Sequence, residues 1–224
     1  PLADSDTVIP FELVEAAKAR DVQAKMVGVV WAVDVARYGG DRSVLIKRKG
    51  NVLLAPALVW AKQDLMQTTG RVKAEWDSTP ADMRPDDICI DAIGLGAGVA
   101  DRLRELGLPA RAINVSESPS LKERYTNLRA ELYFLAREWF QNKDCNLAND
   151  EKLGAELTLL KYKFLSNGKC YIESKDDLKR RGKRSPDLAD AFVLSFAGTA
   201  MTAAFGDSQH NWKTALKRTL KGIA

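Results

Sequence analysis

The alternation of apolar and polar positions along the chain predicts that a mixed α/β domain begins with strands. A nearly continuous apolar run at 27–35 is typical of a strand that is buried on both faces. Two further β-rich runs, at 43–48 and 52–60, flank a short turn that contains Gly50, and this arrangement predicts a hairpin. The chain should therefore open with three antiparallel strands.

Helical periodicity dominates the sequence that follows. Apolar residues at steps of three and four predict helices at 64–77, 97–106, 120–141 and 151–161, with short buried strands at 87–93 and 110–115. Asn167-Gly168 between the β-rich runs 162–165 and 169–173 predicts a second hairpin. A last core helix should begin with Ser185 as N-cap and Pro186 as its first residue. This order predicts a mixed sheet with helices on its faces.

Four aspartates stand at the ends of these elements. Asp34 lies near the end of the first strand, and Asp91 lies near the end of the strand at 87–93. Asp187 and Asp190 occupy the first turns of the last helix and share one face because they are three residues apart. Acids beside apolar runs are costly unless they are paired or bound to a cation. Divalent cations would relieve the repulsion if the four meet.

Three of these aspartates also have a simpler interpretation. Asp187 could complement the dipole of the helix that it opens. Asp34 could initiate a turn, and Asp91 could cap the following helix or stabilise the glycine-containing loop after it. The combination is more specific than any single position, so the set predicts a metal site.

The glycine-containing loop at 94–98 does not favour nucleotide binding. Its third glycine comes one position too early for the GxGxxG fingerprint, and no GxxxxGK[ST] motif occurs in the sequence. The strand before the loop also ends in an acid, which would repel a pyrophosphate group.

Composition narrows the choice of metal. The sequence has one histidine and three widely spaced cysteines, none in a CxxC pair, so a Cys/His zinc site and a disulfide framework are both unexpected. Carboxylates alone would favour Mg²⁺ or Mn²⁺.

The longest apolar stretch, at 191–205, is broken by Ser195, Gly198 and two threonines, so a membrane partner is not expected.

Positive charge is concentrated in the last third of the chain, although the net charge is only +4. Residues 175–184 contain six basic and two acidic residues, and residues 207–224 contain four basic residues and one acid. Such a distribution suggests a contact with a polyanion, although solvated surface loops look the same.

Four segments together resemble the nuclease domain of the large terminase subunit of tailed phages. Three of them resemble the acidic motifs of that family: VVWAVDVARYGGDRSV at 29–44, ICIDAIGLGAGVADRL at 88–103 and KRRGKRSPDLADAF at 179–192. The segment VIPFELVEAAKAR, at 8–20, is similar to the one that follows the ATPase domain in those proteins. The resemblance covers roughly residues 8 to 200.

The resemblance implies a ribonuclease H-like fold and a division of the chain into three parts. Residues 1–26 would be a helical lead-in from an ATPase domain that this sequence lacks, 27–205 the nuclease domain with an added β-hairpin, and 206–224 a basic tail. Asp34, Asp91 and Asp187 match the catalytic, metal-binding acids of the family. Asp190 matches a further ligand found one turn later in related resolvases. Asp41 follows the paired glycines, where the family often has an acid, without a clear role.

The implied activity is two-metal hydrolysis of double-stranded DNA in the cytoplasm of the host bacterium. Two Mg²⁺ or Mn²⁺ ions, bridged by Asp34, would activate water and stabilise the leaving oxygen. The sequence offers no base-reading code, so little specificity is expected. DNA-phosphate contacts are expected from basic residues near the last helix and on the second hairpin: Lys179, Arg180, Arg181, Lys183, Arg184, Lys163 and Lys169.

The same sequence features also fit other functions. A junction resolvase or a ribonuclease would share the fold, and a non-catalytic module could instead dock on DNA or on a motor protein. The implied partners in a complete motor are the portal protein and the small terminase subunit, while the isolated domain should be monomeric. An apolar stripe at Trp212, Leu216, Leu220 and Ile223 predicts an amphipathic helix in the tail, for docking or for packing on the domain.

Overall fold

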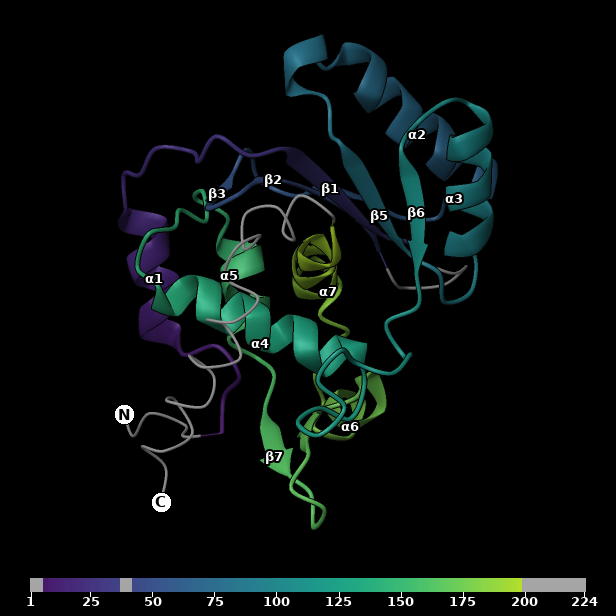
Figure 1. The fold of residues 1–224 in the computed structure, drawn as a ribbon. Helices are drawn as coiled ribbons and strands as arrows, with labels where there is room; N and C mark the ends of the chain where they lie inside the picture. Colours follow the sequence, from purple (N-terminus) through teal and green to yellow (C-terminus); the bar gives the residue numbers. More distant parts are fainter. Residues whose placement is uncertain (1–5, 37–41, 199–224) are drawn as a thin grey trace.

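A mixed β-sheet forms the centre of the chain, in a computed structural model that describes residues 6–36 and 42–198 (Figure 1). Within these residues the sheet has the strand order β3-β2-β1-β5-β6, and β4 also pairs with β2. β1 is antiparallel to β2 and parallel to β5, which is parallel to β6. The strands are β1 (Val29–Asp34), β2 (Ser43–Lys49), β3 (Val52–Leu53), β4 (Leu58–Trp60), β5 (Asp87–Asp91) and β6 (Ala110–Ile113).

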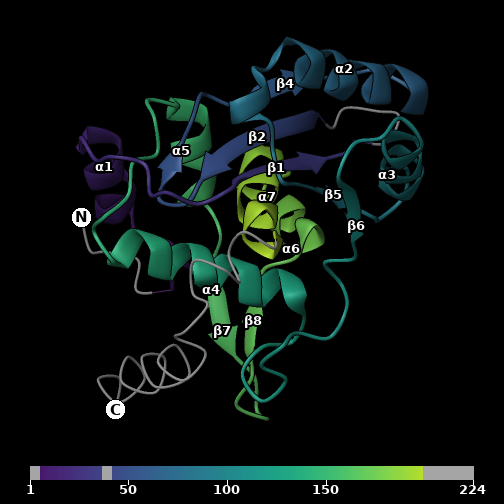
Figure 2. The same cartoon turned by 45° about the horizontal axis from the view of Figure 1, so that its top comes forward.

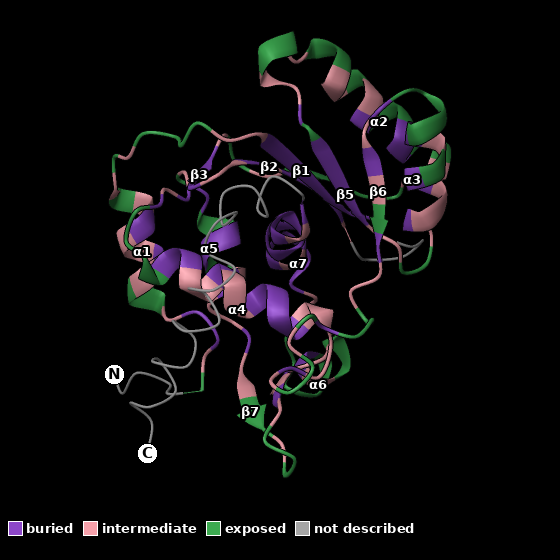
Figure 3. Cartoon of the chain, viewed as in Figure 1, coloured by how far each residue is buried: buried purple, intermediate pink, exposed green. Residues whose placement is uncertain are grey.

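Helices cover both faces of this sheet (Figures 1 and 2). α2 (Leu65–Ser78) and α3 (Gly96–Glu105) lie on one face. On the other face α7 (Asp187–Leu194) lies against the strands, and it is buried almost throughout (Figure 3). α1 (Phe11–Ala19), α4 (Leu128–Gln141) and α5 (Glu151–Leu157) pack on that side too, and the short 3₁₀ helices are η1 (Ala81–Met83) and η2 (Ser195–Ala197).

The pleat of β1 assigns its side chains to two separate cores. Val29, Trp31 and Val33 belong to the core under α2 and α3. Val30 and Ala32 point the other way and cluster with Leu194 of α7. Because successive side chains alternate between faces, Asp34 at the end of the strand falls on the α7 face.

The predicted α/β architecture is confirmed, and so is the second hairpin, formed by β7 (Tyr162–Phe164) and β8 (Cys170–Ile172). Gly168 has a φ of +77°, as a tight turn requires. The hairpin projects away from the body of the molecule (Figure 1). It leads into α6 (Lys175–Arg180), which the apolar periodicity did not predict.

Several predicted boundaries were wrong. The strand expected at 52–60 is divided into β3 and β4, with Pro56 between them. The helix expected at 120–141 begins only at Leu128, because the Asn127 side chain caps it by accepting from the Ala130 N–H. The Glu131 carboxylate instead holds the backbone N–H groups of residues 120 and 121 in a loop. The helix expected at 151–161 ends at Leu157.

Gly96 brings α3 into contact with the end of β5. A Cβ at this position would lie 1.7 Å from the backbone oxygen of Asp91. We therefore expect Gly96→Ala to push the helix away from the strand end and to lower the free energy of unfolding by about 2 kcal/mol or more. Urea denaturation measures this change.

Gly70→Ala is the matched control. A Cβ at Gly70, in the exposed middle of α2, would meet no atom within 4 Å. Alanine should stabilise this helix by about 0.5–1 kcal/mol. Equal effects of the two substitutions would show that the contact between Gly96 and the β5 end does not constrain the fold.

The lead-in segment is only partly described. α1 contributes Val14 and Ala17 to the same core as α4 and α5, so this segment packs on the domain. The predicted amphipathic tail and Asp41 lie outside the described residues. Among the residues that are described, none of the helices combines the length and apolarity of a membrane span.

Candidate active site

The carboxyl ends of β1 and β5 place two aspartates side by side. The parallel register pairs Val33 with Ile90, so the next residues along the two strands are Asp34 and Asp91. Ala32 and Cys89, two residues earlier, both face α7. Asp34 and Asp91 therefore project toward α7 as well.

α7 brings the other two aspartates to the same place. It packs on β1 and β2, with Asp187 as its first residue and Asp190 one turn later. Asp187 is 3% exposed and Asp34 is 7% exposed. The four predicted aspartates thus meet between one sheet edge and the beginning of one helix, although they come from three distant parts of the sequence.

The beginning of α7 is capped by a distant side chain. Ser185 was predicted to be the N-cap, and this prediction was wrong: Pro186 takes that position, and the buried Ser185 hydroxyl makes no hydrogen bond within the described residues. The Glu156 carboxylate, from α5, instead accepts the backbone N–H groups of Leu188 and Ala189 at 2.7 and 3.3 Å. A charged acceptor there also complements the helix dipole.

Arg42 connects this cap to Asp187. Its guanidinium lies 2.6 Å from Glu156 Oε1, and its Nε lies 3.5 Å from Asp187 Oδ2. The Arg42 backbone N–H also donates to Asp187 Oδ2, at 3.2 Å. One oxygen of Asp187 is therefore held by Arg42, immediately before β2, while Oδ1 lies toward Lys175 and the other aspartates.

Asp190 is held from α4. Arg129 Nε and the Tyr133 hydroxyl donate to Asp190 Oδ1 at 3.0 and 2.9 Å. Asp190 Oδ2 is buried and makes no hydrogen bond within the described residues. Both aspartates of α7 thus have one anchored oxygen and one that faces the cluster.

The ammonium group of Lys175 lies among these carboxylates. Its Nζ is 3.9 Å from Asp34 Oδ2, 3.9 Å from Asp187 Oδ1 and 3.7 Å from Asp190 Oδ2. Ser174 caps α6 in a capping box with Asp177, and this cap makes Lys175 the first residue of that helix. Lys175 is thus a cation that three of the four acids share.

Lys175 does not fully offset the burial and the mutual repulsion of Asp34 and Asp91. Burial raises the pKa of Asp34 well above its usual value, Lys175 opposes this shift, and the other three aspartates add to it. Burial also raises the pKa of Asp91, against a hydrogen bond from the Ile93 N–H. Burial lowers the pKa of Lys175, but the aspartates outweigh it and the net pKa is raised. Additional positive charge would therefore stabilise the ionised site.

The donor chemistry of the site fits a hard divalent cation, because the four side chains offer only carboxylate oxygens. Among the described residues, however, no group of three or more His, Cys, Asp or Glu side chains is arranged so that it could hold a metal ion. The Lys175 ammonium stands where such a cation would contact three of the acids. Metal binding would thus have to displace Lys175 and draw the carboxylates together.

Lys175→Ala tests this competition. We expect the variant to bind Mn²⁺ severalfold more tightly than the unmodified chain, because no ammonium must leave the carboxylates. Without metal it should be less stable, since three acids lose a cation that they share. Calorimetric titration with Mn²⁺ measures the affinity, and Lys179→Ala, on the exposed end of α6, is the control. Weaker Mn²⁺ binding by Lys175→Ala would mean that the lysine supports the metal site.

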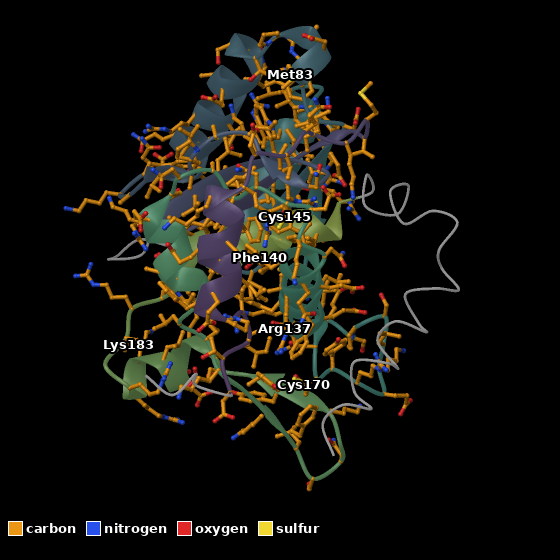
Figure 4. All side chains as sticks on the ribbon, turned by 90° about the vertical axis from the view of Figure 1, so that its left-hand side faces the viewer. Met83, Arg137, Phe140, Cys145, Cys170 and Lys183 are labelled. Atoms are coloured by element: carbon orange, nitrogen blue, oxygen red, sulfur yellow. The ribbon has the colours of Figure 1, made fainter. Side chains whose placement is uncertain are left out.

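The predicted DNA-binding residues divide into three groups. Lys179, Lys183 and Arg184 are exposed and make no ion pair within the described residues, and Lys183 lies at the outer edge of the molecule (Figure 4). Arg180 pairs with Asp177, and Arg181 pairs with Glu173. On the hairpin, Lys163 Nζ lies over the Tyr171 ring and Lys169 is half-buried.

Sequence reasoning did not find the residues that hold the aspartates. Arg42, Arg129, Tyr133 and Glu156 carry no local pattern, because each acts on an aspartate or a helix end far away in the sequence. Lys175 was counted only as part of a basic stretch. The capping pair Ser174 and Asp177 was the one available signal, since it marks the beginning of α6.

Comparison with known proteins gives the fold. No protein-family model and no curated protein matches the chain. A solved nuclease domain of the large terminase subunit gp2 of bacterial virus Sf6 matches with a TM-score of 0.66 and 24% identity, over 84% of this chain and 97% of that one. A large terminase nuclease from thermophilic phage G20c with bound magnesium has a TM-score of 0.61 and 15% identity, over 86% and 97%.

A further structure of the Sf6 domain, a mutant with manganese and β-thujaplicinol, has a TM-score of 0.67 at 24% identity, over 84% of this chain and 97% of that one. These likenesses confirm the expected ribonuclease H-like fold. The chain has the sheet and the flanking helices of known phage terminase nucleases, at an identity that establishes fold alone.

Proposed function

We propose that this chain is a metal-dependent DNA endonuclease, the nuclease domain of a phage DNA-packaging terminase. The observation that carries the proposal is the meeting of Asp34, Asp91, Asp187 and Asp190 beside the carboxyl ends of two parallel strands. The solved domains of similar fold are terminase nucleases, and some of them are described with manganese or magnesium. The sequence motifs around the same aspartates resemble that family independently of the fold.

In this proposal Asp34, Asp91, Asp187 and Asp190 hold two Mg²⁺ or Mn²⁺ ions. Bound together, such ions lower the pKa of water and stabilise the attacking and leaving oxygens of a phosphodiester. Asp34 would hold the ions together with the other three, because it ends β1 beside Asp91 and shares the Lys175 ammonium with Asp187 and Asp190. Because one oxygen of Asp187 and one of Asp190 are fixed by hydrogen bonds, the second oxygen of each stays directed at the site.

The exposed basic residues after α6 would hold the DNA backbone. Lys179, Lys183 and Arg184 belong to the segment that leads into Asp187, so a phosphate bound to them would lie near the acids. Arg180 and Arg181 already have carboxylate partners, which makes them poorer phosphate ligands. Contacts with phosphates carry no base information, in keeping with little sequence specificity.

Neutralising Lys179, Lys183 and Arg184 to Gln should weaken DNA binding across all sequences. It should also reduce the slope of log Kobs against log salt by up to about three phosphate contacts. A triple variant of Lys73, Arg102 and Arg104, on the opposite face of the sheet, is the control and should leave the slope unchanged. Fluorescence anisotropy of a labelled duplex at several salt concentrations measures it. Equal slopes in both variants would place the DNA elsewhere.

The substrate separates this proposal from its rivals of the same fold. With Mn²⁺, linear duplex DNA should be cut at least as fast as a four-way junction or an RNA–DNA hybrid of equal length. Preference for the junction would favour a resolvase, and preference for the hybrid a ribonuclease. If the chain binds DNA but cuts none of the three, it is a docking module.

The remaining parts of the proposal concern the setting of the domain. It would act in the host bacterial cytoplasm within a packaging motor, beside a portal protein and a small terminase subunit, and it would be monomeric on its own. The tail beyond residue 206 would then dock on a motor component.

Deleting residues 207–224 should leave the rate of cleavage of naked DNA within severalfold of the unmodified chain and impair packaging in the complete motor. Loss of folding or of cleavage would assign the tail to the domain core.

A further inference from the structure

We propose that Arg129 and Tyr133 are positioning residues that make Asp190 a metal ligand through Oδ2 alone. This inference rests on the proposed function. Arg129 and Tyr133 both stand on α4, one turn apart, and both donate to Asp190 Oδ1. The two donors occupy one oxygen and fix the plane of the carboxylate.

The other oxygen shows what this arrangement provides. Asp190 Oδ2 is buried, makes no hydrogen bond within the described residues, and lies 3.7 Å from Lys175 Nζ. A buried carboxylate oxygen without a hydrogen bond is costly unless a cation approaches it. Its orientation toward the point shared with Asp34 and Asp187 makes it a ligand held ready for a cation.

Arg129 is itself fixed firmly enough to serve as an anchor. Its Nη1 donates to the backbone oxygen of Glu173 at 2.8 Å, and its guanidinium lies 5.0 Å from the centre of the Tyr133 ring. Only 15% of its side chain is exposed. Nε and Nη2 are both near Asp190 Oδ1, at 3.0 and 2.9 Å, so a lysine could not reproduce the contact.

Asp187 is held in the same way from a different element, by Arg42 through Oδ2. Its Oδ1 is 3.9 Å from the same Lys175 Nζ. Each aspartate of α7 therefore presents a single oxygen to the same point. Two monodentate ligands on one helix face would leave more room for water and phosphate oxygens around a cation than two bidentate carboxylates.

Tyr133→Phe and Arg129→Lys test the inference by Mn²⁺ affinity rather than activity. Removal of a residue that orients a ligand typically weakens metal binding about 10–100-fold. We expect roughly a tenfold loss for Tyr133→Phe, which removes only one hydroxyl, and a larger loss for Arg129→Lys. Isothermal titration of each folded protein with Mn²⁺ gives the affinity, and thermal unfolding without metal reports stability.

Matched controls are available on the same segment. Arg137, labelled in Figure 4, also stands on α4, and its guanidinium lies over the Phe134 and Tyr162 rings. Tyr125 is buried beside the Phe134 ring, whereas the hydroxyl that donates to Asp190 is that of Tyr133. Arg137→Lys and Tyr125→Phe should therefore bind Mn²⁺ as the unmodified chain does.

The outcomes separate this inference from the proposed function. If the unmodified chain binds Mn²⁺ and cuts DNA while Tyr133→Phe retains its affinity within about twofold, the positioning role is wrong and the nuclease proposal stands. If the unmodified chain binds no Mn²⁺, both fail. If Arg129→Lys does not fold, Tyr133→Phe alone decides. A loss of affinity in the folded Tyr133→Phe variant, absent from both controls, supports the inference.

Discussion

Asp34→Asn should abolish DNA cleavage and leave the fold intact. The amide keeps the shape of the side chain at the end of β1 but removes the charge that is coupled to all three other aspartates. Bound metal ions supply several kcal/mol of transition-state stabilisation, so losing one of their carboxylate ligands should slow cleavage by about 10³-fold or more. Plasmid cleavage with Mn²⁺ measures the rate.

The stability of the same variant without metal should stay the same or rise. Burial and the neighbouring aspartates raise the pKa of Asp34 above its value in the unfolded chain. A raised carboxyl pKa favours folding below the unfolded pKa, and this contribution is lost as pH rises through the folded value. Asparagine has no such dependence, so the variant should gain stability over the unmodified chain as pH increases.

Asp77→Asn is the control for this experiment. Asp77 stands at the end of α2 and is half-exposed beside Lys73. Replacing its carboxylate by an amide should therefore change neither the cleavage rate nor the pH dependence of stability. Normal cleavage by Asp34→Asn would remove this residue from the site. Strong destabilisation at neutral pH would mean that the Asp34 charge is structurally satisfied without a metal.

Glu156→Ala should have the largest effect on the stability of the fold outside the central core. The substitution leaves the N–H groups of Leu188 and Ala189 without their acceptor and Arg42 without its closest carboxylate. Loss of a largely buried acceptor that serves two donors and a charge should cost about 3 kcal/mol. Because α7 carries Asp187 and Asp190, cleavage should fall as well.

Glu156→Gln separates capping from charge. The amide oxygen can still accept from the backbone, so this variant should lose only about 1 kcal/mol. Glu151→Ala is the matched control in α5, because Glu151 is 77% exposed and its pair with Lys18 should contribute less than about 1 kcal/mol. Urea denaturation of the three variants gives the comparison. Equal stability of Glu156→Ala and Glu151→Ala would contradict the distant cap.

The sheet and the four aspartates could be predicted because their signals are local. A continuous apolar run followed by an acid marks both β1 and β5, and the spacing of Asp187 and Asp190 fixes their common helix face. The convergence itself is a finding of the structure. The parallel register of Val33 with Ile90 brings Asp34 and Asp91 to one sheet edge, and the packing of α7 on β1 and β2 adds the other two aspartates.

The residues around the aspartates could not be predicted for an equally physical reason. Glu156 caps α7 across 32 positions of sequence, and Arg129 reaches Asp190 across 61. Ser185 has the right chemistry and position for a cap, but Glu156 occupies the N–H groups that it would have served. Lys175 could not be singled out from the sequence, because its contacts with Asp34, Asp187 and Asp190 depend on where α6 packs in the folded chain.

Metal-dependent cleavage of a supercoiled plasmid by the unmodified chain is the decisive measurement for a nuclease site at these aspartates. We expect conversion to nicked and linear DNA with Mn²⁺ or Mg²⁺, no conversion with EDTA, and full recovery when the metal is restored in excess. Asp34→Asn, assayed in parallel, identifies cleavage by contaminating nucleases. Cleavage that is unaffected by EDTA, or no cleavage by folded protein that binds Mn²⁺ and DNA, would contradict a nuclease built on these four aspartates.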